Sequence, residues 1–256
     1  MRRIDRISHK GKFRQTRRKV VHIATYVLIH GSWHASWCWS RLSPKLERLG
    51  HQVIAPTLLG LGELAHLASP QTGLTAHIRQ IELLMQEEEV SDAILVGHSY
   101  GGMILTGVAE LALERISALV YLDAVIPEHG QSCFDLMPGV ESEFRAAAIA
   151  NGCEWLVPPM SAEELGVTDP KDAKWVNEML TPMPMMTHVE KVAAESDRAR
   201  SLLRSYILCE SFGFQHFAEL ARTMEFHRVA SIDSGHDVQL TQPQELLNVL
   251  LGITRD

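Results

Sequence analysis

The chain has 256 residues, of which 46% are hydrophobic and 21% charged, and its formal net charge is −7. These values are ordinary for a globular protein, and the length suffices for one large domain with an insertion. No apolar stretch approaches the ~20 residues of a membrane span, and the acidic balance argues against a nucleic-acid-binding body. A chain of this size buries roughly three quarters of its unfolded surface, so no cofactor is needed to hold it together. We expect no cofactor and no metal ion.

A basic arm opens the chain. Residues 1–19 hold nine lysines and arginines against one acid, which leaves the remainder strongly acidic. The arm lacks the apolar run of a secretory signal, and we interpret residues 1–24 as a disordered appendage. A transit-like peptide, a tail that touches nucleic acid or membrane, and foreign upstream sequence are the alternatives. The four scattered cysteines include no C-x-x-C pair, which favours reduced thiols and a cytoplasmic location.

From residue 25 onward, strands and helices are predicted to alternate. The predicted strands are residues 25–30, 51–55, 92–96, 117–123, 205–209 and 228–232. The predicted helices are residues 44–49, 74–89, 101–113 and 243–251. The strands are near-continuous apolar runs, and the helix over 74–89 carries apolar residues at helical spacing. This alternation predicts an α/β fold with a mostly parallel sheet and helices on both faces.

The alternation breaks between residues 128 and 200, which are richer in Pro, Met and Glu. Helical segments are predicted there at residues 141–150 and 172–180. We interpret residues 128–200 as an inserted helical cap, and residues 25–127 and 201–256 as the α/β core. The cap is expected to supply an adaptable apolar lid over a ligand. Its candidate lid residues are Trp155, Met160, Trp175, Met183, Met185 and Met186. For the methionines, packing in the core of the cap itself is the alternative.

The segment G-H-S-Y-G at residues 97–101 fits the G-x-S-x-G nucleophile elbow, between a predicted strand and a predicted helix. The strained turn is expected to direct the Ser99 hydroxyl toward substrate, and its flanking glycines let strand and helix approach closely. The backbone amide of Tyr100, at the helix start, can donate to a developing oxyanion. Ser32, in H-G-S-W-H at residues 30–34, is the candidate for the second amide donor.

A serine hydroxyl needs a base to act as a nucleophile. Among thirteen histidines, His236 in D-S-G-H-D follows the last predicted strand, late in the chain, as the order serine, acid, histidine requires. Asp123 and Glu210 each lie at the end of a predicted strand and are candidates for the carboxylate that orients His236. Asp123 is favoured, because a carboxylate that interrupts an apolar strand is costly unless it has a partner.

Four residues are expected to contact the substrate. His30 and Trp33 flank Ser32 in the loop after the first strand, and Trp155 and Met160 belong to the predicted cap. Ligands of parallel sheets bind outside the carboxyl ends of the strands, where this loop lies. Packing beneath the first helix is the alternative for Trp33.

Four segments together resemble the α/β-hydrolase superfamily. They are H-G-S-W-H-A-S-W-C-W at 30–39, L-G-L-G-E-L-A-H at 59–66, V-G-H-S-Y-G-G-M at 96–103 and S-G-H-D at 234–237. More narrowly, the chain looks like the branch that holds plant methylesterases, hydroxynitrile lyases and their bacterial esterase relatives. The resemblance implies Ser99 as nucleophile, His236 as base, and the amides of Ser32 and Tyr100 as oxyanion donors.

The chain departs from the plant branch in two respects. Plant members carry the acid after the penultimate strand, where this chain offers only Glu210. Fungal zearalenone lactonases of the same superfamily use an acid after the strand that follows the elbow, which Asp123 matches. The lyases carry a lysine beside the catalytic histidine and a threonine in the first loop, where Asp237 and Gly31 stand here. An anion beside the base would repel cyanide, which favours hydrolysis.

We therefore expect a serine hydrolase that cleaves a small to medium apolar carboxylic ester or lactone through an acyl-enzyme. A carbon–carbon lyase, a non-catalytic ligand receptor on the same fold, and a protein that binds nucleic acid or membrane through its arm are the alternatives. The expected partner is a small-molecule substrate, and a homodimer is left open. The sequence does not separate carboxylesterase, lactonase and carbamate hydrolase activities.

Overall fold

A six-stranded sheet forms the centre of the protein in this computed structural model, which describes residues 23–253. The strand order is β2-β1-β3-β4-β7-β8, and each neighbouring pair is parallel. The strands are β1 (Thr25–Ile29), β2 (Gln52–Ile54), β3 (Ala93–His98), β4 (Ile116–Leu122), β7 (Leu203–Cys209) and β8 (Arg228–Ile232). All six predicted strands are confirmed. The arm predicted over residues 1–24 lies almost entirely outside the described residues.

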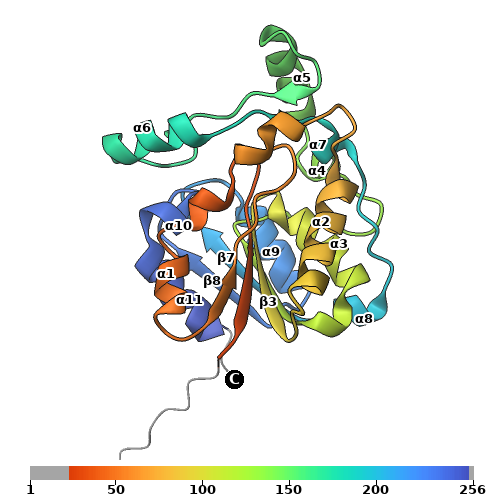
Figure 1. Ribbon diagram of the computed structural model, residues 1–256, viewed down its shortest axis with the longest axis vertical. Coiled ribbons are helices and arrows are strands. Elements are labelled where there is room, and N and C mark those ends of the chain that lie inside the picture. The colour runs from red at the N-terminus through yellow and green to blue at the C-terminus, as the bar shows by residue number, and fades with distance from the viewer. Residues whose placement is uncertain (1–22, 254–256) are drawn as a thin grey trace, which may run out of the picture.

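Helices cover both faces of the sheet (Figure 1). Helices α1 (Ser43–Glu47) and α11 (Pro243–Ile253) lie on one face. Helices α2 (Leu74–Glu87) and α3 (Gly101–Leu111) lie together on the other. Because both faces are covered, every residue of the central strand β3 is buried, which explains the apolar run over residues 93–96. The α/β fold with a parallel sheet is as predicted.

Helix α9 (Gln215–Thr223) was not predicted, although the sequence carries its pattern. It packs against β7 and β8 and completes the crossover between them. Phe217, Ala218 and Ala221 are its buried residues, at the spacing of one helical face.

Several short elements fill the segment between β4 and β7. They are α4 (Cys133–Leu136), α5 (Val140–Ala150), β5 (Leu156–Val157), α6 (Pro170–Met179), β6 (Met183–Pro184), α7 (Met186–Val189) and α8 (Asp197–Arg200). Helices α5 and α6 correspond to the two predicted helical segments and stand beyond the carboxyl end of the sheet (Figure 1). The strands β5 and β6 pair antiparallel. The cap boundaries at residues 128 and 200 stay a prediction.

The remaining elements are short and lie in connections. They are α10 (Val238–Thr241) and the 3-10 helices η1 (Ser36–Trp39), η2 (Gly62–Leu67) and η3 (Leu113–Arg115). Within residues 23–253, no helix combines the length and apolar character that crossing a membrane requires.

Candidate active site

Ser99 lies at the turn from β3 into α3, as the sequence predicted. Its φ is 56°, in the left-handed region that residues other than glycine seldom adopt. A Cβ added to Gly97 would lie 2.6 Å from the carbonyl oxygen of Gly101. One added to Gly101 would lie 2.9 Å from the carbonyl oxygen of Ile29. The two glycines therefore permit the close crossing of strand and helix that keeps Ser99 in its strained conformation.

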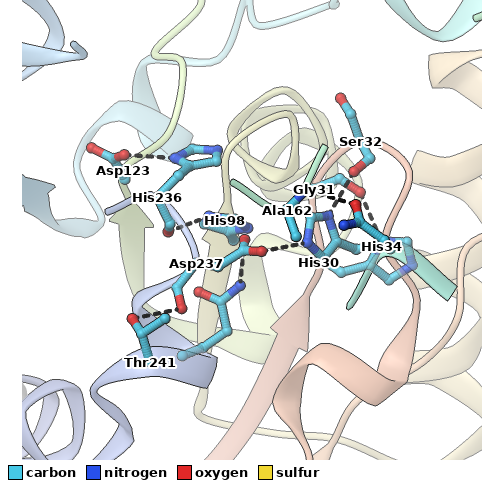
Figure 2. A network of polar contacts seen from close by, with 12 residues as sticks. His30, Gly31, Ser32, His34, His98, Asp123, Ala162, His236, Asp237 and Thr241 are labelled. Atoms are coloured by element: carbon cyan, nitrogen blue, oxygen red, sulfur yellow. Dashed lines mark hydrogen bonds and ion pairs between the residues drawn. The ribbon is translucent and has the colours of Figure 1, made fainter. Parts of the chain in front are cut away.

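His236 and Asp123 form a close buried pair at the carboxyl ends of the strands (Figure 2). The Nδ1 atom of His236 lies 2.6 Å from Oδ2 of Asp123. The other oxygen, Oδ1, accepts a hydrogen bond from the backbone amide of Cys209 at 3.0 Å. An ionised carboxylate only accepts hydrogen bonds, so it holds the imidazole proton on Nδ1. The Nε2 atom of His236 is thereby left as the atom that can accept a proton.

Glu210, the alternative acid, does not contact His236. Its side chain is exposed, and the hydroxyl of Ser231 donates a hydrogen bond to its carboxylate. Asp123 instead follows β4 directly, is fully buried and has a φ of 41°. Of the two candidate carboxylates, the structure brings only Asp123 to the histidine.

Ser99 and His236 both line a cavity of about 650 Å³. Ser32 and Trp33 contribute to its wall from the loop after β1. Apolar side chains form much of the rest, among them Leu136, Val140, Phe144, Met160, Phe212 and Phe214. The exposed carboxylates Glu143 and Glu164 lie at its border. Across residues 23–253, no cluster of three or more His, Cys, Asp or Glu side chains is arranged to hold a metal ion.

Tyr100 is not among the residues that line this cavity. Its hydroxyl lies 3.1 Å from Nδ1 of His77, and its ring stacks on His188 with centroids 5.2 Å apart. Only the backbone amide of Tyr100 is therefore a candidate oxyanion donor. Ser32, the other candidate, lies in the cavity wall.

His30 does not line the cavity, contrary to the expectation from its loop. It is fully buried; its Nδ1 donates to the carbonyl of Gly31 at 2.9 Å, and its Nε2 accepts from the amide of Leu58 at 3.0 Å. Both ring nitrogens are thus used to hold two loops together. His30 is a structural residue of the loop rather than a substrate contact.

The predicted apolar lid is also wrong in most of its residues. Met160 lines the cavity, but the other five candidates do not. Met183 and Met185 are buried in the core, and the carbonyl of Trp155 accepts a hydrogen bond from the Met185 amide. Trp175 packs edge-on against Trp37, with ring centroids 5.2 Å apart.

Sequence reasoning missed His188, which lines the cavity beside Ser32. The hydroxyl of Thr187 donates to the carbonyl of Pro184 at 2.6 Å, so it accepts from Nδ1 of His188 at 2.9 Å. The Nε2 atom of His188 is then the acceptor for the Ser32 hydroxyl, at 3.3 Å. Burial lowers the pKa of His188 to about 3, so the ring is neutral at ordinary pH.

Phe212 is a second residue that was missed. Its ring stacks on the imidazole of His236, with centroids 3.8 Å apart and planes 16° from parallel. It follows β7 at the carboxyl end of the sheet, where ligands of parallel sheets bind, and this rule already pointed to this loop. Phe212 thus packs against one face of the His236 ring, whereas Asp123 contacts the edge of the ring at Nδ1.

Buried neutral histidines predict a loss of stability in acid. Burial lowers the pKa of His30 and His188 to about 3 and that of His77 to about 4. Below pH ~6.5 the unfolded chain binds protons that the folded chain excludes, so the free energy of unfolding falls as pH falls. We expect a loss on the order of 1–2 kcal/mol per histidine between pH 7 and pH 5. Urea unfolding at both pH values measures it, and equal free energies would contradict it.

Comparison with known proteins shows which proteins this chain resembles. A model of the alpha/beta hydrolase family matches residues 26–249. The chain is 37% identical over 244 residues to the carbendazim hydrolyzing esterase of Nocardioides sp. (strain SG-4G), covering 90% of this chain and 100% of that one. It is 28% identical over 255 residues to methylesterase 10 of Arabidopsis thaliana, covering 89% and 90%. The solved extracellular alpha/beta-hydrolase from a Paenibacillus species superposes with a TM-score of 0.80 at 23% identity, covering 91% and 100%.

Proposed function

Because the chain belongs to the alpha/beta hydrolase family, we propose that it is a serine hydrolase that cleaves a neutral apolar ester or lactone. Its similarity to a bacterial esterase and a plant methylesterase agrees with the branch that the sequence predicted, and supports ester cleavage. One observation supports a serine nucleophile in particular. The contact between His236 and Asp123 fixes the histidine tautomer that a serine nucleophile needs, in a cavity that Ser99 also lines.

The proposed reaction proceeds through an acyl-enzyme. Nε2 of His236 takes the hydroxyl proton of Ser99 as its oxygen attacks the substrate carbonyl, and Asp123 stabilises the resulting imidazolium. The amides of Ser32 and Tyr100 donate to the oxyanion, at ~3–4 kcal/mol per donor. The imidazolium then protonates the leaving alcohol, and the same histidine activates the water that releases the acid.

The cavity supports a neutral and largely apolar substrate. Its volume of about 650 Å³ suits a small to medium ligand, and aromatic and aliphatic side chains make up much of its wall. Glu143 and Glu164 at its border disfavour anionic esters.

A substrate panel tests the proposal. It contains p-nitrophenyl acetate, butyrate and octanoate, an aromatic lactone, carbendazim and an aromatic cyanohydrin. We expect turnover of the butyrate ester with a burst of p-nitrophenol. Cyanide release without ester cleavage would instead support the lyase alternative, and binding without any turnover would support a receptor.

Replacing Gly31 by alanine is expected to lower kcat for the butyrate ester at least tenfold. An added Cβ would lie 2.7 Å from Cβ of Ser99, so either the nucleophile or the loop that bears Ser32 must move. Gly252→Ala is the matched control, because a Cβ at that position meets nothing within 4 Å. Equal kcat values for the two variants would contradict the expectation.

We also propose lactone cleavage and a cytoplasmic location. The substrate panel tests lactone cleavage, and cell fractionation tests the location. Size-exclusion chromatography distinguishes a single-chain from a dimeric state. A small-molecule substrate, rather than nucleic acid or membrane, is the proposed partner.

A further inference from the structure

A buried ion pair lies beside the proposed catalytic groups and takes no part in the mechanism above. Nε2 of His34 lies 3.0 Å from Oδ2 of Asp237, and both side chains are buried. His34 is two residues beyond Ser32, and Asp237 directly follows His236. The pair therefore connects the loop after β1 with the loop after β8 (Figure 2).

The hydrogen bonds of His34 define its charge. Its Nδ1 lies 2.8 Å from the carbonyl oxygen of Ser32, and its Nε2 faces the Asp237 carboxylate. Both partners only accept hydrogen bonds, so both ring nitrogens carry a proton. Burial opposes this charge, but the carboxylate of Asp237 and the carbonyl of Ser32 together outweigh it and raise the pKa of His34. Burial likewise opposes ionisation of Asp237, but His34, together with His98 and His236, outweighs it and lowers the pKa of that carboxyl.

The pair belongs to a chain of contacts through three loops (Figure 2). His98, which precedes Ser99, donates from Nε2 to the carbonyl of His236 at 3.0 Å. The loop that bears His236 is thus held on one side by His98 and on the other by His34 through Asp237. These contacts join the loops that carry the nucleophile, the base and the oxyanion amide of the first loop.

Stability alone is a weak reason to bury such a pair. Removing two charges from water is costly, and apolar side chains of similar volume often stabilise a fold as well or better. Charge-assisted hydrogen bonds are directional, so they can fix the position of one loop relative to another. A displacement of ~1 Å among reacting groups lowers a rate by about 100-fold.

We propose that His34 and Asp237 are positioning residues, whose ion pair holds the Ser32 amide and His236 at the spacing that catalysis requires. This inference rests on the proposed function. Loss of the proton from His34 removes one of its two hydrogen bonds, so the positioning is present at neutral pH and is lost as pH rises through the titration of His34. The titratable groups that face the pair are His30, Cys38, His98, Cys209 and His236.

The first test is Asp237→Asn, measured with p-nitrophenyl butyrate. We expect kcat to fall 10- to 100-fold while KM stays within twofold. The alkaline fall of kcat that comes from His34 is expected to be absent, because without the carboxylate burial keeps the His34 ring neutral. A variant with the kcat and pH profile of the wild type would overturn the proposal.

The second test removes both charges together, in the double variant His34→Gln, Asp237→Asn. The double variant leaves no unpaired charge in the protein interior. It therefore tests the proposal even if a single variant, which leaves one partner without the other, fails to fold. We expect kcat at least fivefold below wild type, and a loss no greater than that of the worse of the single variants His34→Gln and Asp237→Asn. We also expect no fall of kcat at alkaline pH that comes from residue 34. Wild-type kcat in the folded double variant, or losses that multiply across the two sites, would overturn the proposal.

Labelling by a serine-directed phosphonate separates this inference from the proposed function. A wild-type protein that is not labelled at Ser99 contradicts the proposed function itself. A wild-type protein labelled at Ser99, with variants that keep wild-type kcat and pH dependence, contradicts only the positioning role.

Discussion

Replacing Asp123 by asparagine is expected to lower kcat for p-nitrophenyl butyrate by about 10³- to 10⁴-fold. The Cys209 amide already donates to Oδ1 of Asp123, so the asparagine oxygen would take that place and its NH₂ group would face Nδ1 of His236. The imidazole proton would then move to Nε2, and the ring could not accept the proton of Ser99. Asparagine tolerates the φ of 41° at this position, so the backbone is expected to stay in place.

Glu210→Gln is the matched control, because it makes the same chemical change at the other candidate carboxylate. Its side chain is exposed and contacts Ser231, so we expect kcat within twofold of wild type. The reverse pattern, with Asp123→Asn active and Glu210→Gln inactive, would show that the assignment of the acid is wrong. Circular dichroism and thermal unfolding of both variants report whether the fold is retained.

Replacing Ser99 by alanine is expected to lower kcat by roughly 10⁴- to 10⁶-fold. The variant loses the oxygen that attacks the carbonyl, but it keeps the amides of Ser32 and Tyr100 and the walls of the cavity. Alanine meets the same steric cost as serine at the φ of 56°, so the free energy of unfolding should change by less than ~1 kcal/mol. Steady-state kinetics and urea unfolding measure the two quantities.

Ser231→Ala serves as the control for that experiment. It removes a hydroxyl from β8 that donates only to the exposed Glu210, so its kcat is expected to equal that of the wild type. More than a tenth of wild-type kcat in Ser99→Ala would mean that another group attacks the substrate.

The strands were predictable because burial on both faces requires apolar side chains, and these form recognisable runs in the sequence. Residues 93–96 of strand β3 are all apolar, and Gly97 and Gly101 mark where the chain turns into α3. The sequence of helix α9 also carries a recognisable pattern, because its buried residues Phe217, Ala218 and Ala221 lie at helical spacing. Its omission was a failure to apply the pattern rather than an absence of signal.

The nucleophile elbow identified Ser99 and chain order identified His236, and both, like Asp123, agree with the rule that parallel strands deliver their following loops to a common edge. The rule locates a loop but not the direction of each side chain in it. His30 was therefore wrongly expected at the substrate, because its turn toward the Leu58 amide depends on a loop 28 residues away.

The rest of the cavity wall was not predictable in this way. His188 and Phe144 come from the segment between β4 and β7, which has no strand of the main sheet to set its position. Methionine content indicated an apolar segment there, but Met183 and Met185 pack into the core whereas Met160 reaches the cavity. Which apolar side chain faces a ligand depends on packing between short elements, and local sequence does not encode that.

The most direct measurement is peptide mapping by mass spectrometry after inactivation with a p-nitrophenyl alkylphosphonate. We expect one phosphonyl group per chain, on the peptide that contains Ser99, at a rate that matches the loss of esterase activity. The adduct should be absent from Ser99→Ala and form far more slowly on Asp123→Asn. Full esterase activity in a protein completely labelled at Ser99, or inactivation that tracks an adduct on another residue, would contradict the assignment of Ser99 as the nucleophile activated by His236 and Asp123.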